Sequence, residues 1–120
     1  PNHIICGYDK IHKLEDPLSS NLPKVVVNSK KELIYISRAL IPGKKKKTKN
    51  SQYYKQVCIY AFNLNQLIKF SSKSKKSTIE KIEDIEILRF FELGIKIKMV
   101  KLNSNSVDGY QISHVYHLLD

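Results

Sequence analysis

The chain has 120 residues, of which 42% are hydrophobic and 27% charged, so it can form one compact core but not two. This composition excludes a disordered, a collagen-like and a membrane-spanning chain. The charge is less ordinary, because 21 Lys and Arg against 11 Asp and Glu leave a net charge of +10 at pH 7. Such an excess favours an anionic partner: a nucleic acid, a phosphorylated metabolite or an anionic membrane.

The first part of the chain has the composition of β-strands. Asn2–Tyr8 is an apolar run rich in Ile, which predicts a buried strand that ends at Gly7. Lys24–Val27 and Glu32–Ser37 are β-branched runs on either side of a polar turn. This arrangement predicts a β-hairpin.

The middle of the chain combines a strand with helices. Tyr53–Phe62 is apolar on both faces, which predicts a central strand. A short helix is expected over Leu64–Phe70, where Asn63 can cap its first turn. Ser77–Glu80 matches a capping box, with the serine as N-cap and the glutamate reaching back to its amide, and predicts a helix over about Thr78–Leu93.

The last part of the chain predicts a strand and a terminal helix. Gly94 ends the preceding helix, and Ile95–Lys101 then alternates between apolar and basic residues, as in a strand at a sheet edge. Ile112–Leu119 has the apolar spacing of a helix. The element order predicts a mixed α/β fold without internal repeats.

The positive charge is confined to one third of the chain. Gly43–Lys76 contains ten lysines and no acid, and most of them lie in two runs, Lys44–Lys49 and Lys69–Lys76, whereas the remainder carries 11 basic and 11 acidic residues. Such runs can bind nucleic acid, form solvated loops or face a phosphorylated substrate. No RRM, KH or zinc-finger pattern accompanies them, so nucleic acid is the less favoured partner.

The cysteines and histidines point to no metal or disulfide chemistry. Cys6 and Cys58 are too few for a disulfide framework, and no leader or long apolar segment is present, so we expect a reducing, cytoplasmic location. Cys58 lies in the middle of a predicted strand and is expected to be a buried, inert thiol. His114 and His117 could share a metal ion on a helix, but without a third ligand they are better interpreted as a surface pair.

Two acidic residues are candidates for a functional site. Asp108 follows a polar turn, where a carboxylate can reach the carboxyl end of a sheet and hold a hard cation such as Mg²⁺; the alternative is a turn or cap aspartate. Glu86 interrupts an apolar band between Ile85 and Ile87. It faces either a polar cavity or solvent.

Several segments together resemble one enzyme family. They are Pro23–Val27, Leu33–Arg38 with Ile41-Pro42, Tyr54–Phe62, Ser77–Glu80 through Ile82-Glu83 to Glu86–Arg89, and Ser106–Asp108. In this order and spacing they are similar to the cytidylyltransferases that activate acid sugars as CMP derivatives, the family of the enzymes for 3-deoxy-manno-octulosonate (KDO) and for acylneuraminates.

The resemblance implies a fold and a reaction. The fold would be the C-terminal portion of a three-layer, Rossmann-like α/β nucleotidyltransferase, with residues 1–120 forming the acid-sugar pocket and dimerisation region and the N-terminal CTP-binding part absent. The enzyme would be a cytoplasmic homodimer that transfers CMP from CTP to a KDO-like sugar with release of pyrophosphate, a step of lipopolysaccharide biosynthesis. This portion alone is expected to be inactive.

The resemblance also implies roles for individual residues. Asp108 would bind Mg²⁺ as a catalytic ligand, and Arg38 would be catalytic beside the sugar carboxylate. The remaining residues would line the sugar site: Lys55, Gln56, Tyr60 and Glu86.

Departures from the family motifs leave the sugar open between KDO and related nonulosonates. They are Gln56, Cys58, Ile87 and Gly109-Tyr110. Two other functions remain as alternatives: a small basic module that binds nucleic acid through the two lysine runs, and a non-catalytic oligomerisation domain.

Overall fold

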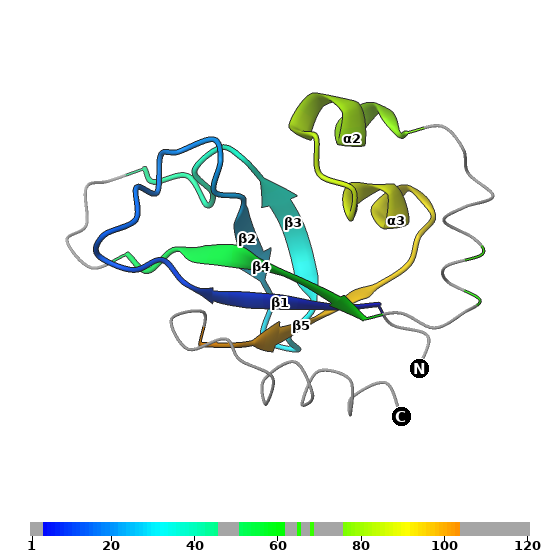
Figure 1. Ribbon diagram of the computed structural model, residues 1–120, viewed down its shortest axis with the longest axis horizontal. Helices are drawn as coiled ribbons and strands as arrows, with labels where there is room; N and C mark the ends of the chain where they lie inside the picture. Colours follow the sequence, from blue (N-terminus) through cyan, green and yellow to red (C-terminus); the bar gives the residue numbers. More distant parts are fainter. Residues whose placement is uncertain (1–3, 46–50, 62–64, 66–67, 69–75, 104–120) are drawn as a thin grey trace.

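The computed structural model describes residues 4–45, 51–61, 65, 68 and 76–103. Five strands and two helices occur in these ranges: β1 (Ile4–Lys10), β2 (Lys24–Val27), β3 (Leu33–Ser37), β4 (Tyr54–Ala61), α2 (Thr78–Glu83), α3 (Leu88–Glu92) and β5 (Ile97–Lys101) (Figure 1). The predicted mixed α/β order is therefore confirmed in the described ranges. Of the helix expected over Leu64–Phe70 only Asn65 and Ile68 are described, and both are helical; the helix expected over Ile112–Leu119 lies outside these ranges.

The strands form one mixed sheet in the order β3-β2-β4-β1-β5. β2 and β3 form the predicted antiparallel hairpin, β4 pairs antiparallel with both β1 and β2, and β5 runs parallel to β1. β4 lies in the middle of the five strands and β5 at one end of the order, as the sequence predicts.

The sheet curls so that its two ends approach each other. Glu32, directly before β3, forms an isolated antiparallel bridge with Lys98 of β5, and the Met99 N–H donates to the Lys31 carbonyl at 2.7 Å. The hairpin turn thus lies beside β5 (Figure 1). This curvature gives the sheet one concave face, part of which α2 and α3 cover.

The main core lies between this concave face and the two helices. Twelve buried residues form it: Ile4, Cys6, Tyr8, Val25, Leu33, Ile36, Ile85, Ile87, Leu88, Phe90, Ile97 and Met99. A smaller cluster of Ile5, Ala61 and Leu102 covers the opposite face. The alternation of β1 residues between the two clusters follows from the period of two in a strand.

The prediction that Gly7 ends the first strand is wrong, because β1 continues to Lys10. Gly7 lies within the strand at a register shift against β4. A Cβ at this position would lie 2.8 Å from Leu102 Cδ1 and 3.3 Å from Val57 Cβ, so a larger residue would collide with its neighbours. Gly7 therefore permits a close approach rather than a strand end.

The prediction of one helix over Thr78–Leu93 is also wrong. Asp84 adopts a left-handed conformation (φ 55°, ψ 49°) and separates α2 from α3. Ile85 and Ile87 are both buried, although in one continuous helix they would point about 200° apart. The break lets both side chains reach the core, and it leaves Ile82 of α2 exposed.

Within the described ranges, no helix is long and apolar enough to cross a membrane.

Candidate functional site

Gln56 and Tyr60 of β4 are in direct contact. The Gln56 Nε2 donates a hydrogen bond to the Tyr60 hydroxyl and also lies 3.9 Å from Cys6 Sγ. Residues four apart in a regular strand are about 13 Å apart. Here the register passes from Cys6 opposite Tyr60 directly to Gly7 opposite Val57, so β4 contains an irregularity that brings Gln56 and Tyr60 together.

This irregularity also corrects the prediction for Cys58. Cys58 falls within it, and the structure leaves it exposed, whereas Cys6 on the neighbouring strand is buried. Burial raises the pKa of Cys6 to about 12, so this thiol stays protonated and inert at neutral pH. The prediction of a buried, inert thiol is therefore wrong for Cys58 and describes Cys6 instead, because a strand pattern in the sequence does not reveal a bulge.

Tyr60 is a hydrogen-bond donor at the surface of this cluster. Burial raises its pKa, and the nearby Cys6, Cys58 and Glu86 raise it further, so the hydroxyl is protonated at neutral pH. Since Gln56 donates to the Tyr60 oxygen, the Tyr60 proton remains available to a ligand. Tyr60 is 36% exposed, whereas Gln56 is 8% exposed and lies behind it.

Glu86 belongs to the same part of the molecule. It lies in the linker between α2 and α3 and is exposed, which decides the open question about its environment in favour of solvent. Its charge contributes to the raised pKa of Tyr60, so the two side chains are within electrostatic range. Of the predicted sugar-site residues, Gln56 and Tyr60 are in direct contact, and Glu86 is near enough to raise the pKa of Tyr60.

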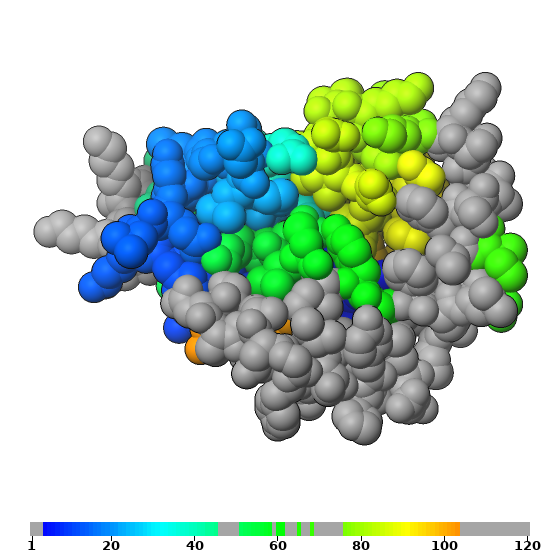
Figure 2. All heavy atoms as spheres, in the orientation of Figure 1, coloured from blue at the N-terminus to red at the C-terminus, as the bar shows by residue number. Residues whose placement is uncertain are grey.

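Arg38 does not contact this cluster in the described structure. Its guanidinium connects the end of β3 to the loop at Ser20 and to the end of α2. Its Nη1 donates to the Ser20 carbonyl at 2.8 Å and its Nη2 to the Asp84 carbonyl at 2.8 Å. Its Nε donates to the Glu83 carbonyl. Figure 2 shows the meeting point, where the blue loop after β1, the cyan end of β3 and the yellow-green helices adjoin. These contacts fix the end of α2 against the hairpin.

Glu83 completes this junction from the helix side. Its carboxylate accepts hydrogen bonds from the Arg38 backbone N–H at 3.0 Å and from the Tyr35 hydroxyl at 3.2 Å. Burial by itself would raise the pKa of Glu83, but the hydrogen bonds from Ser37, Arg38 and Tyr35 outweigh it and lower the pKa. Glu83 is therefore charged at neutral pH.

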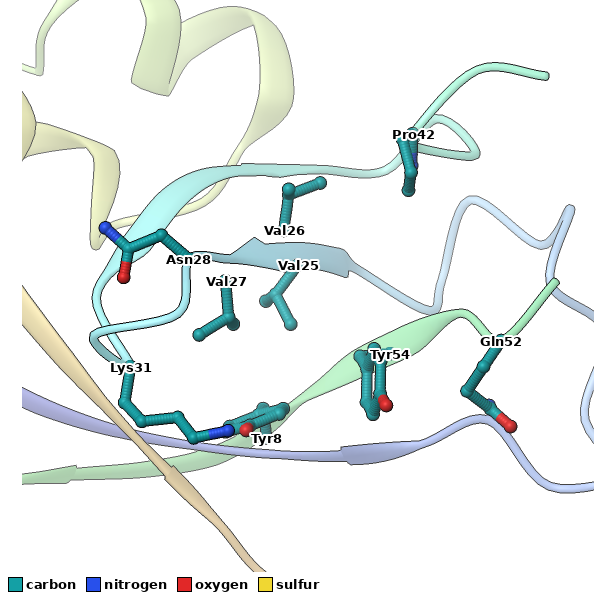
Figure 3. A pocket seen from close by; sticks show the side chains of 9 residues that line it. All are labelled: Tyr8, Val25, Val26, Val27, Asn28, Lys31, Pro42, Gln52 and Tyr54. Atoms are coloured by element: carbon teal, nitrogen blue, oxygen red, sulfur yellow. The ribbon is translucent and has the colours of Figure 1, made fainter. Parts of the chain in front are cut away.

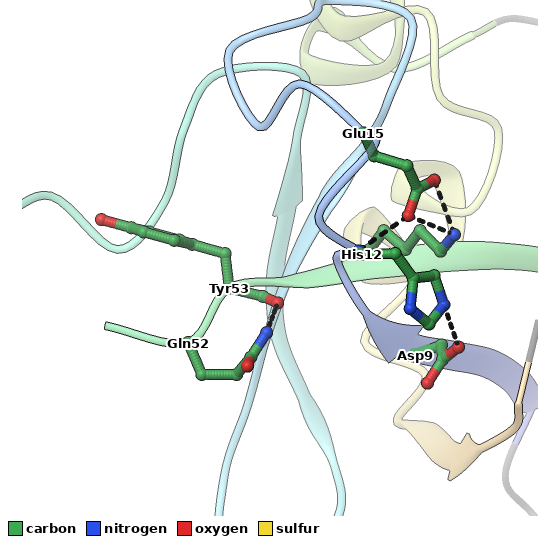
Figure 4. Close-up of polar contacts among 6 residues, drawn as sticks. Asp9, His12, Glu15, Gln52 and Tyr53 are labelled. Carbon is green, nitrogen blue, oxygen red and sulfur yellow. Dashed lines mark hydrogen bonds and ion pairs between the residues drawn. The ribbon is translucent and has the colours of Figure 1, made fainter. Parts of the chain in front are cut away.

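Lys55 precedes Gln56 in β4 and therefore points to the opposite face of the sheet. Its ammonium lies 2.6 and 2.8 Å from the two carboxylate oxygens of Glu15. Glu15 also accepts from the His12 N–H, and His12 in turn contacts the Asp9 carboxylate at 3.1 Å (Figure 4). Lys55 therefore lies away from the Gln56–Tyr60 cluster, and its sugar-binding role stays a prediction.

Asp108, His114 and His117 lie outside the described residues, as do most of the two lysine runs. Lys44 is described, and its ammonium lies 5.5 Å from the centre of the Tyr53 ring. In the part of the chain that is described, no three His, Cys, Asp or Glu side chains are placed to share a metal ion.

Two further buried charges were missed by the sequence reasoning. Lys24 is 0% exposed and donates to the Ser19 carbonyl at 2.8 Å, and burial lowers its pKa. Glu80 is also 0% exposed and accepts two hydrogen bonds from Arg89, at 2.7 and 2.8 Å. Ser77 caps α2 as predicted, but Glu80 reaches α3 instead of the Ser77 amide. The sequence signal that could have indicated this ion pair is Arg89, nine positions after Glu80.

Comparisons with known proteins place this arrangement in a family. The cytidylyltransferase family model matches residues 4–97. The 3-deoxy-manno-octulosonate cytidylyltransferases of Flavobacterium johnsoniae and Thermodesulfovibrio yellowstonii are 39% identical over 88 residues and 37% identical over 95 residues. These alignments cover 72% and 75% of this chain but 36% and 37% of the relatives, so the chain spans little more than a third of their length.

A solved structure agrees with the sequence matches. The structure of CMP:2-keto-3-deoxy-manno-octonic acid synthetase complexed with CTP superposes with a TM-score of 0.71 at 28% identity, over 83% of this chain and 40% of that one. The fold is therefore that of a nucleotidyltransferase, as predicted. By its sequence match over most of its length and by this fold, the chain belongs to the cytidylyltransferase family.

Proposed function

We propose that this chain, together with the CTP-binding part that the family resemblance places before it, transfers CMP from CTP to an acid sugar, KDO or a close relative, with release of pyrophosphate. The observation that carries the proposal is the family match over residues 4–97, and the contact between Gln56 and Tyr60 supports it. In this reaction a sugar hydroxyl attacks the α-phosphate of CTP. The relatives named for KDO support this sugar over other nonulosonates.

The chain's own part in this reaction is to bind and orient the sugar. Tyr60 donates its hydroxyl proton to a sugar oxygen, and Gln56 holds the Tyr60 oxygen in place from behind. Because the pKa of Tyr60 is raised, this group acts as a donor rather than as a general base at neutral pH. Glu86 accepts hydrogen bonds from sugar hydroxyls at the exposed edge of the cluster.

Arg38 acts on this site through the position of α2. Its guanidinium is committed to backbone carbonyls on two other segments, so it fixes the linker that carries Glu86. We therefore assign it a positioning role and not direct contact with the sugar carboxylate. Lys55 likewise braces β4 through Glu15.

The Mg²⁺ ion expected from the family resemblance is not accommodated by the described residues alone. They hold no cluster of three candidate ligands, and the predicted ligand Asp108 lies outside them. A magnesium site built on Asp108, a homodimer and a cytoplasmic location remain parts of the proposal, and no step is derived through the metal.

The test is pyrophosphate release with CTP and KDO by the full-length parent protein, which includes the CTP-binding part. We expect turnover with KDO above that with N-acetylneuraminate, and its loss in Asp108→Ala. Glu92→Gln, at the exposed end of α3, is the matched control and should retain full activity. Absence of pyrophosphate release with either sugar would contradict the proposed function, whereas unchanged turnover in Asp108→Ala would remove only the metal assignment.

A further inference from the structure

A pocket of about 260 Å³ opens on the concave face of the sheet, beside the β2–β3 hairpin (Figure 3). Tyr8 and Tyr54 form one side, the valines of β2 another, and Lys31 of the hairpin turn reaches across it. None of the residues assigned to the sugar site lines this pocket, and neither does any acidic residue.

The Tyr8 hydroxyl is an unsatisfied polar group in this pocket. Tyr8 is only 4% exposed, yet within the described residues its hydroxyl has no hydrogen-bond partner. A buried hydroxyl without a partner costs free energy, and native proteins rarely leave one in that state. Its place on the pocket wall makes this hydroxyl available to a ligand atom.

Lys31 supplies a second unpaired group next to it. Its backbone has φ 62°, a conformation unfavourable for lysine, and is held there by the Asn28 carbonyl and the Met99 N–H. This conformation directs the side chain into the pocket, toward the hydroxyl end of Tyr8 (Figure 3). Among the described residues no carboxylate pairs with the Lys31 ammonium.

The rest of the pocket favours an apolar body. The Tyr8 and Tyr54 rings meet edge to face with centroids 5.6 Å apart, and Val25 and Val27 lie beside them. Lys101 adds positive charge, with its ammonium 6.0 Å from the centre of the Tyr54 ring. The volume suits a molecule the size of one ring rather than a nucleotide.

We propose that this pocket binds a small organic anion. Its carboxylate or phosphate accepts hydrogen bonds from the Lys31 ammonium and the Tyr8 hydroxyl, and its ring or apolar body packs on Tyr54 and the β2 valines. Charge-assisted bonds of this kind provide both affinity and orientation. The proposal is independent of the sugar site and of the transfer reaction.

The test is isothermal titration calorimetry of the natural protein with three probes: phenyl phosphate, benzoate and benzyl alcohol. We expect saturable binding of at least one of the two anions and none of the alcohol; comparison of the anions distinguishes a phosphate from a carboxylate ligand. Lys31→Met should weaken binding of the anion about tenfold or more. The matched control Lys30→Met, on the same turn, should leave it unchanged.

Tyr8→Phe separates a binding role from a structural one. Removal of an unsatisfied buried hydroxyl should not lower Tm, while it should weaken anion binding several-fold. No saturable binding of either anion, or equal binding by wild type and Lys31→Met, would overturn the proposal. Because the readout is binding and not turnover, this result is separate from the fate of the proposed function.

Discussion

Two regions of the molecule differ in how their polar groups are paired. One is the junction between α2 and the sheet, and the other is the pocket beside the β2–β3 hairpin. At the junction, Glu80 is paired with Arg89, and Glu83 accepts bonds from Tyr35 and the Arg38 backbone. In the pocket, the Tyr8 hydroxyl has no partner within the described part of the chain. Paired buried groups hold the fold together, whereas unpaired ones are available to a ligand. Mutations should therefore affect stability at the junction and binding at the pocket.

The largest expected effect is at the buried ion pair between the two helices. Glu80→Gln removes the buried carboxylate charge that pairs with Arg89 at 2.7 Å, and we expect a loss of about 3 kcal/mol in the free energy of unfolding, measured by urea denaturation. Glu92→Gln on exposed helix surface is the control and should change stability little. A Glu80→Gln protein as stable as wild type would show that the junction is not held by this pair.

The next largest effect on stability is expected at Arg38, where a structural role can be distinguished from direct contact with the sugar. Arg38→Lys keeps the charge, but its single nitrogen cannot reach the carbonyls of Ser20, Glu83 and Asp84 at once, so we expect a loss of about 2 kcal/mol in unfolding free energy. Lys81→Gln, exposed on α2, serves as control. Unchanged stability with a raised KM for the sugar would instead place Arg38 in direct contact with the substrate.

A smaller effect is expected from the pH dependence of the same junction. The pKa of Glu83 lies below its ordinary 4.5 in the folded protein, so its charged form contributes stability that is present above 4.5 and lost as pH falls through the lowered value. Glu83→Gln should be less stable than wild type at neutral pH, and the difference should shrink in acid. A difference that stays constant from neutral pH to about pH 3 would contradict this assignment.

The strands were predictable because their signals are local. The β-branched runs around Asn28 and the apolar segment at Tyr54–Ala61 gave the hairpin and the central strand, and the alternation of Ile97 and Met99 with Lys98 gave the edge strand. The helix break was not predictable in this way. The left-handed conformation of Asp84 allows Ile85 and Ile87 both to be buried, and this burial is a tertiary requirement that local sequence signals do not show.

The family motifs nominate Gln56, Tyr60 and Glu86 for the sugar site, and this assignment stays a prediction. The structure adds that Gln56 is hydrogen-bonded to Tyr60 and that Glu86 raises the pKa of Tyr60. Motif spacing could not show that the Arg38 guanidinium is occupied by backbone carbonyls, or that Lys55 faces Glu15. Nor could it reveal the pocket at Tyr8, which depends on the curl of the sheet and on which hydroxyl lacks a partner.

The most direct test of the central claim, that this chain carries the acid-sugar site of a cytidylyltransferase, is the effect of Tyr60→Phe on steady-state kinetics. Loss of the hydroxyl donor should raise the KM for KDO about tenfold while the KM for CTP and the urea midpoint stay near wild type. Tyr53→Phe, on the same strand region but away from the cluster, should leave both KM values unchanged. An unchanged KM for KDO in Tyr60→Phe, or a rise in the KM for CTP alone, would contradict the account.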